Sequence, residues 1–220
     1  MNSFREKFTT IFEAIRPEST AEDEFAIVLN APPEISHALD DVRRRYDPAF
    51  KTGIPPHITV KRPALLLSKD KVPALHEAVR QVVHNFPPFP VQLQGYGLFK
   101  SAGRNVLFLK VQNEEPFCAL HNQILDALRQ IYPNGQADRY EDTNYHPHLT
   151  IGNELSEIDL AVLEYELKTG GYRLDFSFIL DEISLFLHEA RQPWNVLDTF
   201  KFGADLPPGN QDFAQEGTRL

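Results

Sequence analysis

The sequence predicts a mixed fold of helices and strands, arranged as two similar lobes that face each other across a cleft. Strand-like and helix-like segments alternate along the chain, and the order strand, helix, strand, helix, strand occurs in both halves. In each half the middle strand directly follows a Pro, begins with a His and carries a Thr two residues later, as "PHITV" at 56–60 and "PHLTI" at 147–151. A repeated unit with the same motif at the same place is typical of two related lobes.

The first unit follows from hydrophobic periodicity. It consists of a buried-type strand, a helix, the first motif strand, a second helix, and a strand in which apolar residues alternate with Gln. Their predicted bounds are 24–30, 35–46, 57–61, 72–86 and 89–97.

The second unit repeats this order and adds strands at its end. Pro116 is acceptable at the start of its first helix, Ser156 and Asp159 approximate a capping box at the start of its second, and Gly170 ends that helix. The predicted bounds are 105–112, 117–131, 148–152, 156–169, 172–180, 182–189 and 194–202.

The two ends of the chain lie outside these units. Residues 1–17 have Phe and Ile at helical spacing before Pro17, which predicts an amphipathic helix that packs on the domain. Docking of this helix on a partner or a membrane surface is an alternative, disfavoured because Glu6 and Glu13 balance its basic residues. Residues 203–220 are polar and rich in Gly and Pro without a period, so we expect a tail. The predicted domain is therefore 24–202.

Composition limits the partners. The 31 acidic and 22 basic residues give a formal net charge of −9, which excludes a general polyanion-binding surface. We therefore expect a small cyclic nucleotide or a short RNA end as substrate rather than an extended nucleic acid. The sequence leaves the oligomeric state open, with a monomer as the favoured expectation.

Cysteine usage and hydropathy indicate the compartment. The single Cys118 excludes an intramolecular disulfide and lies among apolar residues, which predicts a core position. No segment approaches the roughly 20 apolar residues of a membrane span, and the N-terminus is charged where a signal peptide needs an apolar run. The sequence therefore predicts a cytoplasmic protein without membrane contact.

The repeated motif suggests acid–base chemistry on a phosphodiester. On a strand, residues i and i+2 share a face, so His57 lies beside Thr59 and His148 beside Thr150. One imidazole can take a proton while the other gives one, and the hydroxyls can donate to non-bridging phosphate oxygens. This scheme needs no metal or other cofactor.

The tetrapeptides "HITV" and "HLTI", with strands and helices around each, resemble the paired His-x-Thr-x motifs of the 2H phosphoesterase superfamily, which includes bacterial 2′-5′ RNA ligases and cyclic phosphodiesterases. The resemblance covers residues 24–202. It implies a bilobal α+β fold with an antiparallel sheet and helices in each pseudo-symmetric lobe and an active site between the lobes. It also implies action on 2′,3′-cyclic phosphates, 2′-5′ linkages or ADP-ribose cyclic phosphate. By position, His57 and His148 would be catalytic, and Thr59 and Thr150 would bind the phosphate.

Several neighbouring residues are further candidates. Lys61, at i+4 from His57, would share its face and bring positive charge to the phosphate, although a solvated strand end is as good a reading. Phe99 and Tyr145 could stack a base, but packing in or near the core is the more common role of such aromatics. Trp194, at the start of a strand, is interpreted as a packing residue.

Two other classes of function remain open. His146 and His148 have a spacing that a metal site could use, with His57 and His188 as further ligands, but a His-based metal hydrolase leaves the paired Thr residues unexplained. A non-catalytic binder of cyclic nucleotides or RNA ends would need the same phosphate contacts. The sequence favours a metal-independent phosphodiesterase and leaves open which His is the acid.

Overall fold

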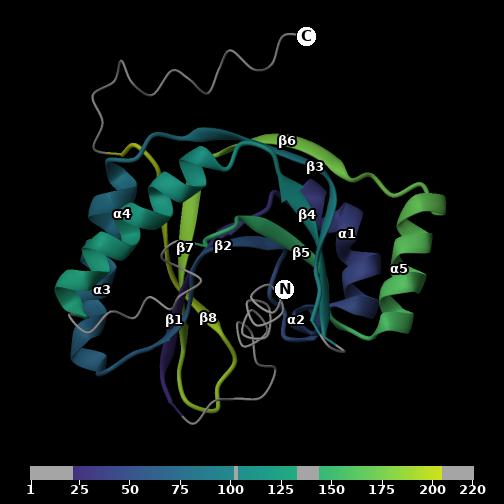
Figure 1. The fold of residues 1–220 in the computed structure, drawn as a ribbon. Helices are drawn as coiled ribbons and strands as arrows, with labels where there is room; N and C mark the ends of the chain where they lie inside the picture. The colour runs from purple at the N-terminus through teal and green to yellow at the C-terminus, as the bar shows by residue number, and fades with distance from the viewer. Residues whose placement is uncertain (1–21, 102–103, 133–143, 205–220) are drawn as a thin grey trace, which may run out of the picture.

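A computed structural model describes residues 22–101, 104–132 and 144–204 (Figure 1). The helix expected at 1–17 and residues 205–220 of the expected tail lie outside the described residues. The strands are β1 (Glu24–Asn30), β2 (His57–Leu65), β3 (Phe89–Phe99), β4 (Asn105–Val111), β5 (His148–Leu155), β6 (Asp175–Leu180), β7 (Glu182–His188) and β8 (Asn195–Lys201). The helices are α1 (Pro33–Tyr46), α2 (Pro48–Lys51), the 3-10 turn η3 (Lys69–Lys71), α3 (Val72–His84), α4 (Glu115–Ile131) and α5 (Glu157–Thr169).

The elements predicted between residues 24 and 202 are present, with shifted ends. The predicted cap of α5 is confirmed, because the Ser156 hydroxyl accepts a hydrogen bond from the Asp159 amide at 3.1 Å. The four-residue helix α2 was not predicted, since it is too short to show a period. It begins at a cap in which the Asp47 carboxylate accepts from the Ala49 amide.

The strands form one antiparallel sheet in the order β6-β3-β4-β5-β2-β1-β7-β8. Its two four-stranded parts are β6-β3-β4-β5 and β2-β1-β7-β8. Within the described residues, the sheet passes from one part to the other where the motif strands β2 and β5 pair at Ile58 and Leu149. These parts are the two lobes. They do not coincide with the halves of the sequence, because β3 pairs with strands of the second half while β7 and β8 extend the sheet of the first.

The helices cross between the lobes. Although α1 connects β1 to β2, it packs against β5, and α4, which connects β4 to β5, packs against β2. Figure 1 accordingly shows α3 and α4 on one side of the central strands and α1 and α5 on the other. Each lobe is therefore covered by one helix from each half of the sequence, which ties the two motif strands to both halves.

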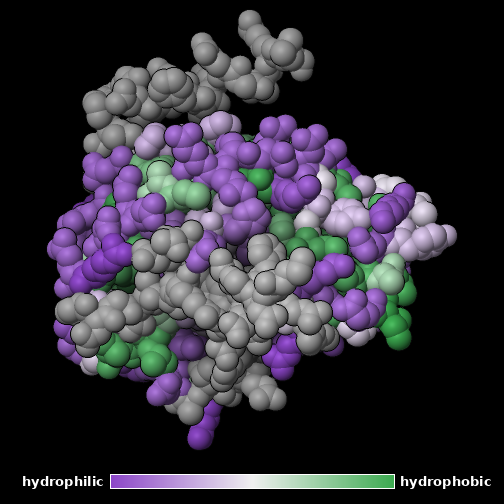
Figure 2. Space-filling view, in the orientation of Figure 1, coloured by the Kyte–Doolittle hydropathy of each residue, from purple (hydrophilic) through white to green (hydrophobic). Residues whose placement is uncertain are grey.

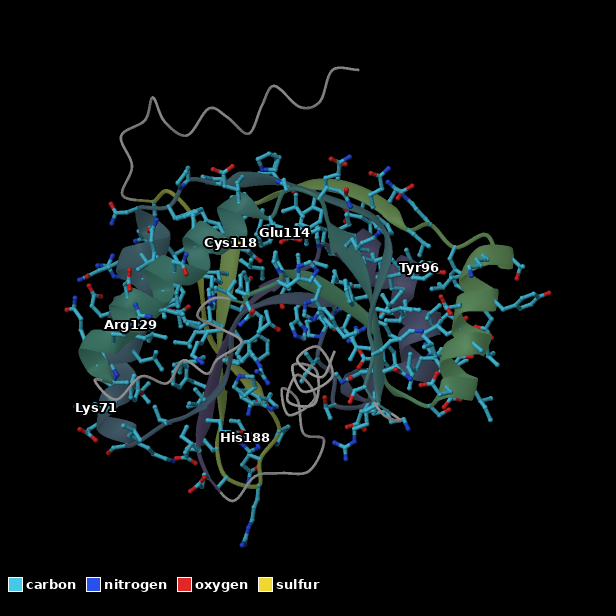
Figure 3. All side chains as sticks on the ribbon, viewed as in Figure 1. Lys71, Tyr96, Glu114, Cys118, Arg129 and His188 are labelled. Carbon is cyan, nitrogen blue, oxygen red and sulfur yellow. The ribbon has the colours of Figure 1, made fainter. Side chains whose placement is uncertain are left out.

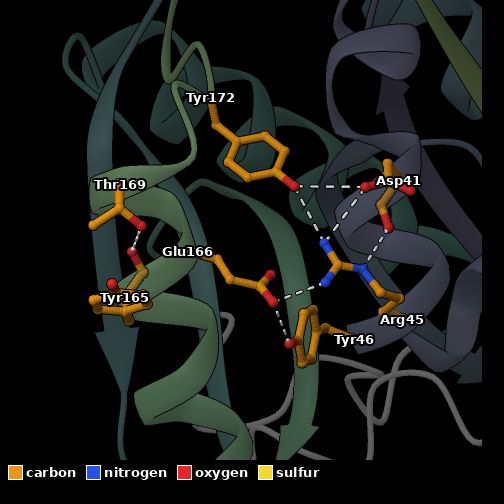
Figure 4. A network of polar contacts seen from close by, with 7 residues as sticks. All are labelled: Asp41, Arg45, Tyr46, Tyr165, Glu166, Thr169 and Tyr172. Carbon is orange, nitrogen blue, oxygen red and sulfur yellow. Dashed lines mark hydrogen bonds and ion pairs between the residues drawn. The ribbon is translucent and has the colours of Figure 1, made fainter.

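A polar network holds α1 beside α5 (Figure 4). The Arg45 guanidinium donates to Glu166 at 2.8 Å and to the Tyr172 hydroxyl at 3.2 Å, and it also pairs with Asp41 at 3.5 Å. The Tyr46 hydroxyl donates to the same Glu166 oxygen at 3.2 Å. Because the Arg45 side chain is 40% exposed, water screens these pairs, and we expect each to stabilise the fold by less than about 1 kcal/mol.

The outer surface carries some apolar residues. On α5, Ile158, Val162 and Tyr165 are exposed, while Leu160 and Leu163 on the same helix are buried in the core. Figure 2 shows hydrophobic atoms at the edge of the molecule that α5 forms. Among the described residues, no helix has both the length and the apolar character needed to cross a membrane.

Cys118 differs from its prediction. It lies on α4 (Figure 3) and is partly exposed, whereas its neighbours Phe117 and Leu120 are fully buried. The apolar residues around it in the sequence fix the buried face of α4, but Cys118 lies at the border of that face. Partial burial and the Glu114 carboxylate raise the pKa of its thiol.

Candidate active site

The site is built around the pair that joins the two lobes. Ile58 and Leu149 are 2% and 0% exposed and point into the core. Side chains alternate along a strand, so the neighbours of Ile58 and of Leu149 in the sequence project from the opposite face of the sheet. This register sets His57 across from Thr150 and Thr59 across from His148. The four motif residues therefore lie around one point, and diagonal neighbours in such a pair are about 7–8 Å apart, which leaves room for a phosphate.

Both imidazoles are held in the same way. The Nδ1 of His57 lies 2.9 Å from the Pro55 carbonyl oxygen, and the Nδ1 of His148 lies 2.7 Å from the His146 carbonyl oxygen. A carbonyl can only accept, so Nδ1–H donates in each ring. In both rings the neutral tautomer therefore carries its proton on Nδ1. Each Nε2 is available as a base or, once protonated, as an acid.

The surroundings lower both histidine pKa values. Burial lowers the pKa of His57, with a further lowering from Arg43, while the Pro55 hydrogen bond and Asp47 oppose the shift. Burial lowers the pKa of His148 to about 4, and the charges of His146, His57 and Arg62 act in the same direction against the hydrogen bond to the His146 carbonyl. Both rings are therefore neutral at pH 7 in the free protein, and an acid role requires an anion that favours the imidazolium.

Aromatic rings form the wall beside His148. Phe99 meets the His148 ring edge to face at 4.9 Å between centroids, and Phe108 lies 5.0 Å from it. The two Phe rings are 4.3 Å apart. Gly97 is needed here, because a Cβ at that position would lie 2.6 Å from the Phe108 ring. The structure thus brings Phe99 to the site, where it packs on a catalytic candidate; base stacking by Phe99 stays a prediction.

Tyr145 supports the motif strand. Its hydroxyl donates to the Thr59 carbonyl at 2.9 Å, and its ring lies flat on His121 at 3.9 Å. His121, 1% exposed, is itself bonded through Nδ1 to the Val60 carbonyl. With both the hydroxyl and one face of the ring in use, these contacts favour the packing interpretation of Tyr145 over base stacking.

The expectation that Lys61 shares the face of His57 is wrong. The register runs from Val28 opposite Thr59 to Ile27 opposite Lys61, so β2 has an extra residue at this point. Such a bulge reverses the alternation beyond it. Lys61, 1% exposed, lies opposite the core residue Ile27, and its Nζ donates to the Arg62 carbonyl at 3.1 Å.

Arg62, the next residue, supplies the positive charge that was expected from Lys61. It is partly exposed, and its charge acts on the pKa of His148. Its neighbour Pro63 lines the space beside His57. The sequence shows two adjacent cations after the motif, but only the bulge decides which of them faces the site.

A hollow adjoins His57. It has an empty volume of about 380 Å³, counting solvent at its open side, and its lining is almost entirely apolar. The lining residues are Ala26, Val28, Ile54, His57, Thr59, Pro63, Phe186 and Trp194. Trp194 also packs on His188, with centroids 5.2 Å apart. Trp194 therefore packs, as the sequence predicted, and it also lines the hollow beside His57, which the sequence did not predict.

The four histidines considered as metal ligands are not brought together. His188 pairs in register with Glu24, whereas His57 pairs with Asn30 at the other end of β1 (Figure 3 labels His188). The length of β1 separates these ends by roughly 20 Å. The Nδ1 of His146 instead lies 3.1 Å from the Glu114 carboxylate. Within the described ranges, no three His, Cys, Asp or Glu side chains form a group that could hold a metal ion.

Solved structures share the fold. The chain superposes on TT0787 of Thermus thermophilus with a TM-score of 0.60 and 17% identity, covering 83% of this chain and 99% of that one. Escherichia coli LigT, solved with 3′-AMP, gives a TM-score of 0.57 at 17% identity, covering 82% of this chain and 98% of LigT. These likenesses confirm the expected bilobal α+β architecture.

Sequence comparisons identify the family. The chain is 28% identical over 181 residues to a Halalkalibacterium halodurans protein named "Putative phosphoesterase BH1439", which covers 82% of this chain and 98% of that protein. A Geobacillus kaustophilus protein, "Putative phosphoesterase GK0864", is 26% identical over 179 residues, with 81% and 96% covered. The sequence pattern of the 2′-5′ RNA ligase superfamily matches residues 31–192, a span that includes both motifs. The chain therefore belongs to the 2′-5′ RNA ligase superfamily.

Proposed function

We propose that the protein is a metal-independent phosphodiesterase that acts on a 2′,3′-cyclic phosphate or a 2′-5′ linkage in a small nucleotide or at an RNA end. One observation carries the proposal: two neutral imidazoles, each with a free Nε2, and two Thr hydroxyls meet around the Ile58–Leu149 pair. The superfamily and the names of its relatives agree with phosphoester chemistry.

The mechanism follows from this arrangement. The Nε2 of one His takes a proton from the attacking water, and the other His, protonated at Nε2, gives a proton to the leaving oxygen. The hydroxyls of Thr59 and Thr150 donate to the non-bridging oxygens, where negative charge grows in the transition state. Since both histidine pKa values are lowered in the free protein, the substrate anion must stabilise the proton on the acid.

The two sides of the site suggest which His is the acid. The apolar hollow adjoins His57 and Thr59 and can hold the base of a leaving nucleoside against Trp194. A leaving oxygen placed on this side lies next to His57. The positive charge of Arg62 disfavours a proton on His148, whereas at His57 the negative charge of Asp47 opposes that of Arg43. We therefore assign His57 as the acid and His148 as the base.

The first experiment measures hydrolysis of 2′,3′-cyclic nucleotides, a 2′-5′ dinucleotide and ADP-ribose cyclic phosphate in the presence of a chelator. Wild type is compared with His57→Ala and His148→Ala. Loss of a general acid or base is expected to lower kcat by about 10² to 10⁴-fold. Activity that disappears with chelator and returns with zinc would overturn metal independence, and tight binding of a cyclic phosphate without turnover would favour a binding module.

A substrate with a good leaving group can show which His is the acid and which is the base. A p-nitrophenyl phosphodiester needs no proton on its leaving oxygen at neutral pH. His57→Ala should therefore lose much less activity on this ester than on a cyclic nucleotide, while His148→Ala should lose activity on both. The reverse pattern would exchange the two roles without affecting the proposed reaction.

A further inference from the structure

We propose that the buried ion pair of Arg43 and Asp47 positions His57 for proton transfer, which makes Arg43 a positioning residue of the active site. This inference rests on the proposed function and deepens it. Neither residue belongs to the His-x-Thr motif, and both come from the end of α1, a helix that packs on the lobe opposite β2.

The pair is buried, and both of its residues make further hydrogen bonds. Arg43 is 1% exposed and Asp47 3% exposed. The Arg43 Nε donates to Asp47 Oδ2 at 2.9 Å, and Nη2 lies 2.8 Å from the same oxygen. The other carboxylate oxygen, Oδ1, accepts from the Ala49 amide at 3.1 Å. Burial of two charges is costly unless each is bonded in this way, and apolar residues often stabilise a core equally well. Fold stability alone therefore gives little reason for this pair.

The contacts of the pair continue to the His57 ring. Arg43 Nη2 donates to the Ile54 carbonyl at 3.0 Å. The next carbonyl along the chain, that of Pro55, accepts from His57 Nδ1 at 2.9 Å. The Pro55 carbonyl sets the tautomer and the direction of the His57 ring. The guanidinium holds the Ile54 carbonyl, one residue earlier, and so fixes the loop that carries Pro55. A planar fork can bind a carboxylate and a carbonyl together, which a lysine ammonium does less well.

The pair also acts on His57 through charge. The groups whose charges or dipoles act on the pKa of His57 are Arg43, which lowers it, and Asp47 and the Pro55 carbonyl, which raise it. His148 faces it from β5. Removal of Arg43 and removal of Asp47 should therefore shift the pKa of His57 in opposite directions, a result that a purely structural role does not produce.

The same helix offers a matched control. Arg45 lies two residues from Arg43 and also forms an ion pair, with Glu166 at 2.8 Å, in a network that joins α1 to α5 (Figure 4). The carbonyls of Ile54 and Pro55 are bonded instead to Arg43 and His57. Substitution Arg45→Met therefore removes an arginine ion pair from α1 without changing the contacts of Ile54 and Pro55.

The experiment compares Arg43→Lys, Asp47→Asn, the double change Arg43→Met with Asp47→Leu, and Arg45→Met. The double change removes both charges together and so avoids an unpaired buried charge. For folded variants, kcat should fall by about 10- to 100-fold for the double change and less for Arg43→Lys, with KM within about threefold of wild type. Arg45→Met should keep the wild-type kcat.

A second readout needs no turnover. The pKa and tautomer of His57, measured by NMR on labelled histidine, should show a lower pKa in Asp47→Asn, and loss of the single Nδ1–H tautomer in the double variant. A double variant that folds with wild-type kcat and unchanged His57 signals would overturn the inference. If the double variant does not fold, Arg43→Lys with wild-type kcat and an unchanged tautomer would overturn it. Absence of turnover in wild type would instead count against the proposed function, while the NMR result would still decide the inference.

Discussion

The two copies of the motif present the same groups but stand in different surroundings. On the His57 side, the neighbours are an apolar hollow with Trp194 and a loop held by a buried ion pair. On the His148 side, the neighbours are the rings of Phe99 and Phe108 and the charge of Arg62. The symmetric part explains how a phosphate can be held, because that needs equal donors on both sides. In the proposed mechanism, the asymmetric part would let the site distinguish a leaving nucleoside from an attacking water.

Thr59→Val and Thr150→Val test the symmetric part and should have the largest effect among the variants below. Loss of one preorganised donor to a charged transition state costs about 10² to 10³-fold in kcat. Because the two Thr residues lie in equivalent positions, we expect losses within about tenfold of each other, measured on one substrate. Replacement by Ser, which keeps the hydroxyl, should restore most of the activity. A large loss from only one of them would mean that the phosphate is held from one lobe.

Arg62→Gln tests the charge on the His148 side. The positive charge of Arg62 lowers the pKa of His148, so its removal should move the acid limb of kcat/KM to higher pH. A charge-assisted contact to phosphate is worth about 1.5–3 kcal/mol, which corresponds to a loss of about tenfold or more in kcat/KM. Because Arg62→Lys keeps the positive charge, we expect a smaller shift of the acid limb and a smaller loss of kcat/KM than for Arg62→Gln.

Lys61→Met is the matched control for Arg62. Since Lys61 lies opposite Ile27 in the core register, we expect kcat/KM to change by less than about threefold in the folded variant. A larger loss from Lys61→Met than from Arg62→Gln would show that the bulge does not set the orientation described above.

Trp194→Leu tests the hollow on the His57 side. Stacking on an aromatic ring is worth about 1–3 kcal/mol per base, so KM for a cyclic nucleotide should rise about tenfold. For a ribose cyclic phosphate without a base, KM should stay close to wild type. Phe99→Leu serves as the comparison on the other side, where we expect kcat to change more than KM because Phe99 contacts His148. Equal effects of Trp194→Leu on both substrates would exclude a base in the hollow.

The smallest effect predicted here is the change in acid stability caused by His148→Gln, which is separate from the loss of activity expected for any substitution of His148. The folded-state pKa of His148 is lowered to about 4, so between its ordinary value and about pH 4 the unfolded chain binds a proton that the folded protein does not. The folded protein therefore loses stability as the pH falls through this window, and the His148→Gln variant should unfold at a lower pH than wild type. Circular dichroism during acid titration measures the midpoint of unfolding. His37→Gln, at an exposed position on α1, should leave the midpoint unchanged.

The two motif strands show which features of the site can be predicted from sequence and which cannot. Alternation along a strand correctly places a His and a Thr of each motif on one face, because that relation depends only on local geometry. The prediction failed at Lys61, where the extra residue in β2 reverses the alternation, and nothing in "HITVKR" marks the bulge. The pairing of β2 with β5, and the exchange of helices between lobes, depend on contacts between distant segments that periodicity does not contain.

The sequence by itself determined the longer helices and the strands, the two motifs and the chemistry that two imidazoles and two hydroxyls can perform, because these depend on residue type and local spacing. Only the tertiary structure decided that the motif strands pair at Ile58 and Leu149, that Arg62 rather than Lys61 faces the site, and that Trp194 borders a hollow beside His57. It also brought Arg43 of α1 to the loop before His57. The physical reason is that strand register and helix packing are set by burial of the whole core, to which every segment contributes.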